Sequence, residues 1–259
     1  MNRFNSDRNV LKRTSTERFN NFDDLSIEII TKQHFEHTIL FDVAVSDGRA
    51  SCYFLNKAIK IIPRFTYTGS DISFRYYLYK KSQQSKSYIV LDDEGRIVEI
   101  TYPPFVWNLS RLEGGFYFIN NFLKKHFAKQ VKLDLSHGKY NLHDIIDLLS
   151  PDYYKIITEN HFSLINYNLI NEFDKKYTVI RTMNILHYGY FNREQINLIM
   201  NNIFHGLEAN GLLIEGSNEE TGSPVEGAIW QKNETRFNLI NEPENPSRIK
   251  DLVLSFKPA

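Results

Sequence analysis

The chain has 259 residues and a hydrophobic content of 42%, enough for one large α/β domain or for one domain with an insertion. Its 31 basic and 31 acidic residues cancel, so no global field attracts nucleic acid or an anionic membrane, and we expect neither as a partner. The single cysteine excludes an internal disulfide framework within the chain, and the lack of a long apolar run or a signal segment leads us to expect a cytoplasmic protein.

Residues 1–22 are polar, rich in Asn, Arg and Ser, and without apolar periodicity. We interpret them as a flexible N-terminal tail, with a ligand-covering flap or a partner-binding arm as alternatives. From Asp23 to about Phe35 the sequence predicts a short helix, because its acidic first residues suit the positive end of the helix dipole. Residues 23–259 are assigned to one domain.

A strand, a turn, a helix and a second strand follow in that order. The apolar run 38–45 predicts a strand, 46–48 a turn, 49–60 a helix, and 65–71 a second strand that ends in Asp71. Small residues in such a turn let the backbone approach a ligand closely, and the helix amino terminus offers unpaired N–H groups. A carboxylate after the second strand can accept both hydroxyls of a ribose. The unit therefore has the parts of a ribose-binding site, although Asp71 could instead cap a helix.

The block at about 80–155 interrupts this alternation, and we interpret it as an insertion or lid. Its alternating runs 87–91 and 96–100 flank the Asp/Gly turn 92–95 and predict a β-hairpin. Residues 113–149 are predicted to be mostly helical. The block is rich in aromatic residues, and because pockets for small ligands are mainly apolar, this favours a small, partly apolar substrate.

The alternation of strands and helices then resumes. Buried parallel strands are covered on both faces, so they are continuous apolar runs rather than alternating ones. An amphipathic helix is predicted from Asn192 to Leu207. Together with the earlier strands, these elements predict a largely parallel sheet with helices on both faces. The further strands are predicted at 162–169, 177–181, 212–214, 228–231 and 251–256.

The segment from Arg181 to Tyr190 begins at the carboxyl end of a predicted strand, the edge where ligands bind in open parallel sheets. His187 is the only histidine in it, and the ordinary pKa of a histidine, near neutrality, suits a general base. Tyr190 is the second candidate catalytic residue. Each has a structural alternative, since a lone histidine is often structural and an aromatic residue often packs in a core or lid. No helical His-x-x-x-His pair occurs, so no metal site is expected.

The first strand and its turn carry Asp42-x-Ala44-x-Ser46-x-Gly48. This segment resembles the acid-x-Gly-x-Gly-x-Gly motif of the class I S-adenosylmethionine-dependent methyltransferases. The nearest resemblance is to the chemotaxis-receptor (CheR-type) glutamate methyltransferases, which also have Ala and Ser before the retained Gly. Further segments similar to these enzymes follow in the same order along the chain, and they are Asp71–Ile72, Asn168–Leu169, Asn184–Leu186 and Leu207–Ser217.

The resemblance implies a Rossmann-like α/β fold with a seven-stranded, mostly parallel sheet whose last strand is antiparallel. It implies S-adenosyl-L-methionine as the cofactor and methyl transfer to a small molecule or a protein side chain as the activity. Because the leaving group of such a displacement is good and neutral, positioning and desolvation supply much of the barrier reduction. A general base is needed only if the acceptor must lose a proton.

The same resemblance assigns the candidate cofactor-binding residues. The turn after the first strand would hold the methionyl portion, Asp71 the ribose hydroxyls, and Asn168 the adenine edge. Arg181 would line the cleft through its backbone, while its side chain could pair with a buried carboxylate. The full set is Asp42, Ala44, Ser46, Gly48, Asp71, Asn168, Leu169, Arg181 and Asn184.

Two other functions stay open. Ala44 and Ser46 in place of glycines, together with the lack of an obvious base, are compatible with a catalytically inactive cofactor-binding regulator or partner subunit. A nicotinamide-dependent oxidoreductase would need a Gly-x-Gly-x-x-Gly turn, which the sequence does not contain. No motif specifies the acceptor atom or the oligomeric state.

Overall fold

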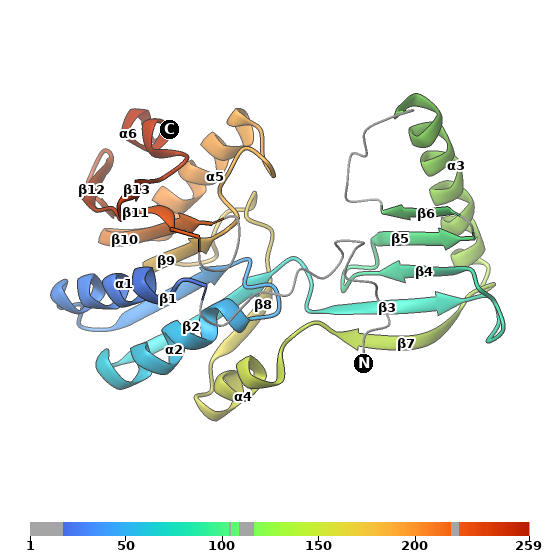
Figure 1. Ribbon diagram of the computed structural model, residues 1–259, viewed down its shortest axis with the longest axis horizontal. Helices are drawn as coiled ribbons and strands as arrows, with labels where there is room; N and C mark the ends of the chain where they lie inside the picture. The colour runs from blue at the N-terminus through green and yellow to red at the C-terminus, as the bar shows by residue number, and fades with distance from the viewer. Residues whose placement is uncertain (1–17, 104, 109–116, 219–222, 259) are drawn as a thin grey trace. The chain divides into compact units, whose positions relative to one another are not determined.

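A computed structural model describes residues 18–103, 105–108, 117–218 and 223–258 (Figure 1). The chain divides into two compact units. The core unit comprises Met1–Ile72 and Leu149–Ala259, and the inserted unit comprises Ser73–Leu148. In the part of the chain that is described, no helix has the length and apolar character needed to cross a membrane.

The core unit is built on one largely parallel sheet. Its strands are β1 (Thr38–Val43), β2 (Phe65–Asp71), β8 (Ser163–Asn166), β9 (Tyr177–Met183), β10 (Leu207–Ser217), β11 (Glu226–Lys232), β12 (Phe237–Asn241) and β13 (Asn245–Pro246). They lie in the order β12-β11-β10-β9-β1-β2-β8, and the two-residue β13 pairs with β11. The strands from β8 to β10 in this order are parallel, whereas β11 is antiparallel to β10 and to β12. The fold is therefore Rossmann-like α/β.

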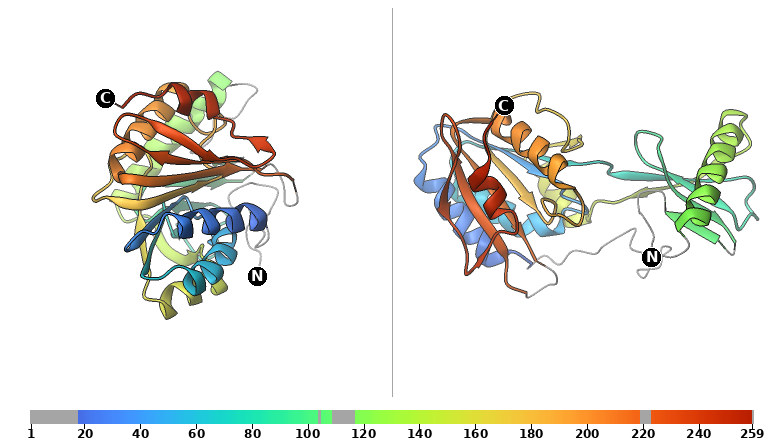
Figure 2. Two further views of the ribbon diagram at one scale, coloured as in Figure 1. Left: turned by 90° about the vertical axis from the view of Figure 1, so that its left-hand side faces the viewer. Right: turned by 90° about the horizontal axis from the view of Figure 1, so that it is seen from above.

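Helices cover both faces of this sheet (Figures 1 and 2). They are α1 (Asn20–Lys32), α2 (Arg49–Ile61), α4 (Pro151–Glu159), α5 (Arg193–Gly206) and α6 (Lys250–Ser255). Side chains alternate across β1, so that Phe41 and Val43 pack with α5 and α6, whereas Asp42 contacts Ser51 on α2. Burial of both faces explains why the parallel strands are continuous apolar runs.

The strand order reverses between β1 and β9. From β1 the chain continues to β2 and β8 on one side of the sheet, and β9 and β10 lie on the other side. Such a reversal leaves a crevice at the carboxyl ends of the two strands, where ligands bind in open α/β sheets. The loops at this edge begin at Ala44 after β1 and at Asn184 after β9, and Asp71 ends β2.

The inserted unit is an antiparallel sheet with one helix, α3 (Tyr117–Ser136). Its strands are β3 (Arg75–Lys80), β4 (Tyr88–Leu91), β5 (Ile97–Tyr102), β6 (Phe105–Asn108) and β7 (Asn141–Asp147). They lie in the order β6-β5-β4-β3-β7, and every pair is antiparallel. Ile89, Ile100 and Val131 are the buried centre of this unit, so α3 and the sheet share a small core of their own.

Most of the predicted core elements are confirmed. The helix predicted from Asn192 is α5, and its start follows from a capping box, in which Asn192 and Gln195 each bind the other's backbone N–H. The predicted hairpin is β4 and β5. Residues 18–22, which the sequence analysis assigns to the tail, behave differently, since Phe19 and Phe22 are buried and α1 begins at Asn20. The remainder of that tail, 1–17, lies outside the described residues.

Three local predictions are wrong. Residues 141–147 form β7 rather than helix, because they pair with β3, a strand remote in sequence that the analysis missed. Residues 251–256 form α6 rather than a strand, and their buried positions Ile249, Leu252, Val253 and Phe256 have helical spacing. The predicted antiparallel strand near the end of the sheet is β11, and the two-residue β13 runs parallel to it. The helix α4, whose first residues fall within the predicted insertion at about 80–155, belongs to the core unit.

Candidate functional site

The loop after β1 has an unusual backbone. Ala44, Ser46 and Gly48 all have positive φ, at 57°, 57° and 78°. A residue with a Cβ in this conformation costs on the order of 1–2 kcal/mol, so two of the three positions are strained. The loop is tied to β2, because the backbone N–H of Ser46 donates to Asp71 Oδ2 at 2.7 Å. The chain therefore keeps left-handed conformations at the alternate positions where the motif it resembles has glycines.

Relief of this strain is a direct test of the loop geometry. We expect Ala44→Gly to raise the free energy of unfolding by about 0.5–1 kcal/mol, because the left-handed strain outweighs the entropy that glycine adds to the unfolded chain. The matched control is Ala58→Gly inside α2, which is expected to lower it by about 1 kcal/mol. Urea titration of both variants measures the difference. A loss of stability at position 44 equal to that at position 58 would contradict the left-handed geometry.

Gly48 and Gly69 make room for one buried side chain, Tyr153 of α4. A Cβ at Gly48 would lie 2.1 Å from the Tyr153 ring, and a Cβ at Gly69 would lie 2.2 Å from its hydroxyl oxygen. Gly48 thus lets the helix α4 pack closely against the start of α2. Its contact with a cofactor stays a prediction.

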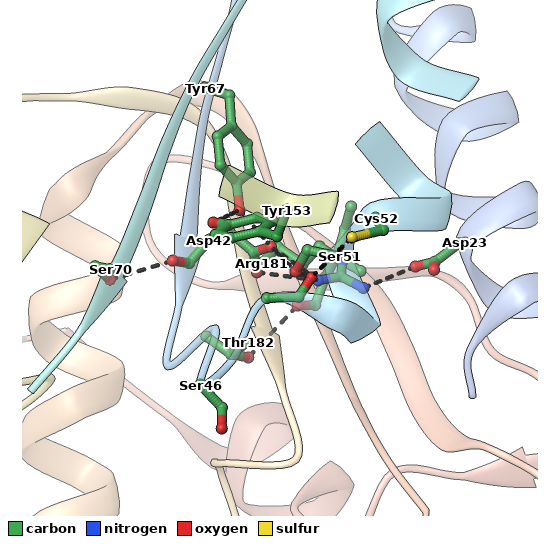
Figure 3. Close-up of polar contacts among 12 residues, drawn as sticks. Asp23, Asp42, Ser46, Ser51, Cys52, Tyr67, Ser70, Tyr153, Arg181 and Thr182 are labelled. Carbon is green, nitrogen blue, oxygen red and sulfur yellow. Dashed lines mark hydrogen bonds and ion pairs between the residues drawn. The ribbon is translucent and has the colours of Figure 1, made fainter. Parts of the chain in front are cut away.

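A buried polar network lies beneath this loop, on the face of the sheet that α1, α2 and α4 cover (Figure 3). Asp42 Oδ2 accepts hydrogen bonds from the hydroxyls of Ser51 at 2.7 Å and Tyr67 at 3.0 Å. Arg181 Nη1 donates to both carboxylate oxygens of Asp42 at 3.0 Å, and its Nη2 donates to Asp23 Oδ1 at 2.8 Å. The side chains of Asp42 and Arg181 therefore bind each other in the interior, as the sequence analysis expected for Arg181. Only their backbones remain as candidate ligand contacts.

The charged groups of this network differ in how well their partners compensate them. Burial raises the pKa of Asp23 to about 6, against the opposing effect of the nearby Arg181 guanidinium. Burial alone would lower the pKa of Arg181, but the carboxylates of Asp42 and Asp23 outweigh it and raise that pKa above its ordinary value. Among the described residues, Asp23 Oδ2 and Arg181 Nε have no hydrogen-bond partner. Arg181 is therefore a permanent buried cation that joins α1, β1 and β9.

Asp71 differs from Asp42 because its carboxylate lies at the edge of the sheet and is partly exposed. Its Oδ1 accepts from the N–H of Ile72 at 2.7 Å, and its Oδ2 from that of Ser46. Asp71 thus lies at the carboxyl edge of the sheet, and its contact with a ribose stays a prediction.

The remaining cofactor candidates make structural contacts. Asn168 Oδ1 accepts from the N–H of Ile170 at 3.2 Å and forms a turn, and Leu169 is buried in the core. Asn184, with φ of 57°, accepts from the N–H of Asn218 at 2.9 Å through its side-chain oxygen and so joins the ends of β9 and β10. Ligand contacts of these three residues stay predictions.

The candidate catalytic residues lie in the turn after β9. The N–H of Gly189 donates to His187 Nδ1 at 3.1 Å. The ring of Tyr190 lies 4.6 Å from the His187 ring, centroid to centroid, and its side chain is exposed. The two side chains therefore form one unit at the carboxyl edge of the sheet.

Sequence reasoning missed a contact between Arg18, two residues before α1, and this edge. Arg18 Nη2 donates to the backbone oxygen of Asn218 at 2.7 Å, and Asn218 Nδ2 donates to the backbone oxygen of Arg18 at 3.1 Å. Burial lowers the pKa of Arg18, with Tyr190 acting in the opposite direction. No local sequence pattern predicts this pairing, because the partners are 200 residues apart in the chain.

A signal did exist for Asp23, whose role in the network was also missed. It shares one helical face with the buried residues Phe19, Ile27 and Ile30, at spacings of four and seven residues. An acid on an apolar face predicts a buried cationic partner. Its position in the first turn of α1 was instead interpreted through the helix dipole alone.

Neither the thiol of Cys52 nor a metal cluster of described side chains adds a reactive group to this site. Burial raises the pKa of the Cys52 thiol to about 11, so the thiol stays protonated at neutral pH and is no nucleophile. Within the described ranges, no group of three or more His, Cys, Asp or Glu side chains could hold a metal ion.

No protein-family model matches the chain, and no curated protein sequence does. Several solved structures are similar to it. One is an S-adenosylmethionine-dependent methyltransferase from Clostridium acetobutylicum ATCC 824, with 10% identity and a TM-score of 0.37 over 90% of this chain and 77% of that one. Another is the N-methyltransferase NodS from Bradyrhizobium japonicum WM9 in complex with S-adenosyl-L-homocysteine, with 9% identity and a TM-score of 0.35 over 76% of this chain and 61% of that one.

A third is an O-methyltransferase family protein from Burkholderia thailandensis, with 8% identity and a TM-score of 0.36. The similarity covers 78% of this chain and 39% of that protein. This chain therefore spans well under half the length of that protein. These three structures are of methyltransferases. Because their TM-scores lie below 0.5, these similarities support no conclusion about the activity of this chain.

Proposed function

We propose that this protein is an S-adenosylmethionine-dependent methyltransferase that acts on a small-molecule acceptor. The observation that carries the proposal is the backbone of the loop after β1, where Ala44, Ser46 and Gly48 are all left-handed. Strained conformations persist where the surrounding structure over-determines them, and they concentrate at ligand-binding sites. This loop also faces the crevice at which the strand order reverses.

The residues of the edge fit the parts of this cofactor. The loop 44–48 would hold the methionyl portion, and Asp71, which already orients the N–H of Ser46, would accept the ribose hydroxyls. When bound, the cofactor supplies an activated methyl group whose leaving group is a neutral sulfide. The buried pair of Asp42 and Arg181 joins β1 to β9 beneath the loop and so keeps the two halves of the crevice in register. The protein contributes positioning and exclusion of water.

The proposed acceptor follows from the side chains exposed at the same edge of the sheet. Tyr188 and Tyr190 are 55% and 54% exposed there, and exposed aromatic side chains suit a planar, partly apolar small molecule. The receptor-type enzymes that the sequence resembles act on protein glutamates, and a protein side chain is therefore the alternative acceptor. We expect the protein to act in the cytoplasm.

The first experiment is isothermal titration of the full chain with S-adenosylmethionine and with S-adenosylhomocysteine. We expect both to bind with micromolar dissociation constants. Asp71→Asn should weaken both by about tenfold to one hundredfold, because hydrogen bonds to a charged group contribute about 1.5–3 kcal/mol. The asparagine retains one side-chain oxygen, which can still accept from the N–H of Ser46. Asp251→Asn, an exposed aspartate of α6, is the matched control and should change nothing.

The outcomes separate the competing functions. Absence of binding in a folded sample would refute the methyltransferase proposal. Binding without methyl transfer to any acceptor would favour a catalytically inactive regulator or partner subunit. Equal affinities of the parent and Asp71→Asn would remove Asp71 from the site while leaving the cofactor assignment intact.

A further inference from the structure

Asn184 ends the strand β9 in an unusual way. Its backbone N–H still donates to Gly216 O on β10 at 2.7 Å, as that of a strand residue would. Its φ, however, is 57°, so the chain leaves the sheet in a left-handed turn. The N–H of Asn218 then donates to the side-chain oxygen of Asn184 at 2.9 Å. The side chain of Asn184 thus supplies β10 with a hydrogen-bond acceptor at the point where β9 has ended.

Asn218 uses further polar groups on the segment that leads into α1. Its Oδ1 accepts from Arg18 Nε, its Nδ2 donates to Arg18 O at 3.1 Å, and its backbone oxygen accepts from Arg18 Nη2 at 2.7 Å. Asn218 is only 6% exposed, so water competes little for these groups. We call Arg18, Asn218 and Asn184 the edge clasp. It joins the segment before α1, the end of β10 and the end of β9.

The turn that follows Asn184 carries the two exposed tyrosines of this edge. Leu186 is buried in the core, and the N–H of Tyr190 donates to His187 O at 3.1 Å. The exposed rings of Tyr188 and Tyr190 are therefore attached to a short, internally bonded turn. Because Asn184 is the residue at which this turn leaves the sheet, the position of both rings depends on how Asn184 is held.

We propose that the edge clasp positions the turn 185–191 for the acceptor, with Asn184 as the positioning residue and Asn218 as its partner. The proposal rests on the proposed function, since Tyr188 and Tyr190 are the side chains offered to the acceptor there. The bonds of the clasp are made by residues of this chain alone, so binding of the acceptor does not have to order the turn. A turn held in this way presents its two aromatic rings in one arrangement, which suits a rigid, planar acceptor.

Two replacements of Asn184 separate the hydrogen bond from the backbone conformation. Asn184→Gly keeps the left-handed turn, since glycine readily adopts positive φ, but it removes the side-chain oxygen. Asn184→Asp keeps both, because aspartate also tolerates this conformation and its carboxylate can accept from the N–H of Asn218. Asn210→Gly is the matched control, since Asn210 is exposed, has φ of 61° and lies on β10 outside the clasp.

Hydrogen exchange of the full chain measures how firmly the turn is held. Asn184→Gly is expected to raise the exchange rates of the amides in 185–191 about tenfold, because the loss of one hydrogen bond makes local opening more frequent. Asn184→Asp and Asn210→Gly should exchange as the parent does. Unchanged exchange of the turn in Asn184→Gly, or an equal acceleration in Asn184→Asp, would refute the proposal.

A spectroscopic signal reports on the geometry of the turn rather than on its stability. The rings of His187 and Tyr190 lie 4.6 Å apart, centroid to centroid, so the ring current of the tyrosine shifts the Cε1–H resonance of the histidine. The size of this shift is the difference between the parent and Tyr190→Leu. It should shrink in Asn184→Gly and persist in Asn184→Asp. An undiminished shift in Asn184→Gly would show that the turn keeps its geometry without the clasp, and it would overturn the positioning role.

Failure of this proposal and failure of the proposed function are distinguishable. The titration of the parent with S-adenosylhomocysteine tests the cofactor site and does not depend on the variants of the clasp. Absence of binding would refute the methyltransferase proposal and, with it, the role of the turn toward an acceptor. Binding of S-adenosylhomocysteine together with unchanged exchange in Asn184→Gly would refute the positioning role of the clasp alone.

Discussion

Replacement of Arg181 by methionine is expected to lower the free energy of unfolding by about 3–5 kcal/mol, because removal of one partner leaves buried carboxylates uncompensated. The Arg181 side chain is 1% exposed and forms ion pairs with Asp23 at 2.8 Å and with Asp42 at 3.0 Å. Methionine has a similar length, so the loss reports on charge rather than on a cavity. Urea denaturation at pH 7 measures it.

The control for this prediction is the exposed pair of Lys32 and Glu28, since Lys32→Met should change stability by less than about 0.5 kcal/mol. A second variant separates charge from packing. Arg181→Met combined with Asp23→Leu should recover part of the loss, because one of the two stranded carboxylates is then absent. If Arg181→Met changed the free energy of unfolding by no more than Lys32→Met does, this result would contradict the buried ion pairs of Arg181.

Glu215→Gln is expected to stabilise the protein at alkaline pH by about 3 kcal/mol, the value of a pKa shift from 4.5 to about 7. Glu215 lies on β10 and is 3% exposed, and burial raises the pKa of its carboxyl to about 7. Its neighbours are neutral donors, with Trp230 Nε1 at 3.4 Å and the Ser247 hydroxyl also hydrogen-bonded. In the part of the chain that the structure describes, no cation offsets the charged form, so ionisation of this carboxyl destabilises the protein.

The sign of the pH dependence follows from the proton balance. Because the folded pKa is raised, the native state binds a proton that the unfolded state has already lost between pH 4.5 and about 7. The contribution of Glu215 to stability therefore falls as pH rises through this window and is constant above it. Asp23, whose pKa is raised to about 6, also makes the protein less stable as pH rises. Thermal unfolding between pH 4 and pH 8.5 should show a smaller fall for Glu215→Gln than for the parent.

The matched control is Glu208→Gln, an exposed glutamate on the same strand, which should leave the pH profile of stability unchanged. Parallel profiles for Glu215→Gln and the parent would show that Glu215 has an ordinary carboxyl in the folded protein. The two variants together separate the burial of one side chain from the general effect of removing a negative charge.

The elements that sequence reasoning located were those with strong local signals. The capping box of Asn192 and Gln195 marks the start of α5, and the apolar runs mark β1, β9 and β10. The strand β7 was missed because its hydrogen bonds go to β3, more than sixty residues earlier in the chain, and nothing in its own residues announces that partner. The helix α6 was missed although its buried residues have helical spacing, since a short apolar run suits either structure.

The residues of the candidate site also differ in how far the sequence predicted their positions. Asp71 and the turn Ala44–Gly48 lie at the carboxyl edge, where the strand–turn–helix–strand pattern predicts a ligand. Asp42 comes from the same pattern, yet its side chain binds Arg181, Ser51 and Tyr67 in the interior. Adjacent residues of a strand point to opposite faces, and the pattern contains no information about what covers each face.

The sequence by itself determined the order of most strands and helices in the core unit, with α6 as an exception, and the small and acidic residues at the carboxyl ends of the strands, because apolar runs, caps and turn residues act over a few neighbours. Only the tertiary structure decided which of those residues face solvent and which are buried partners. That choice depends on segments far apart in the chain, such as Asp23 of α1 and Arg181 of β9, which meet only when the sheet and its helices are assembled.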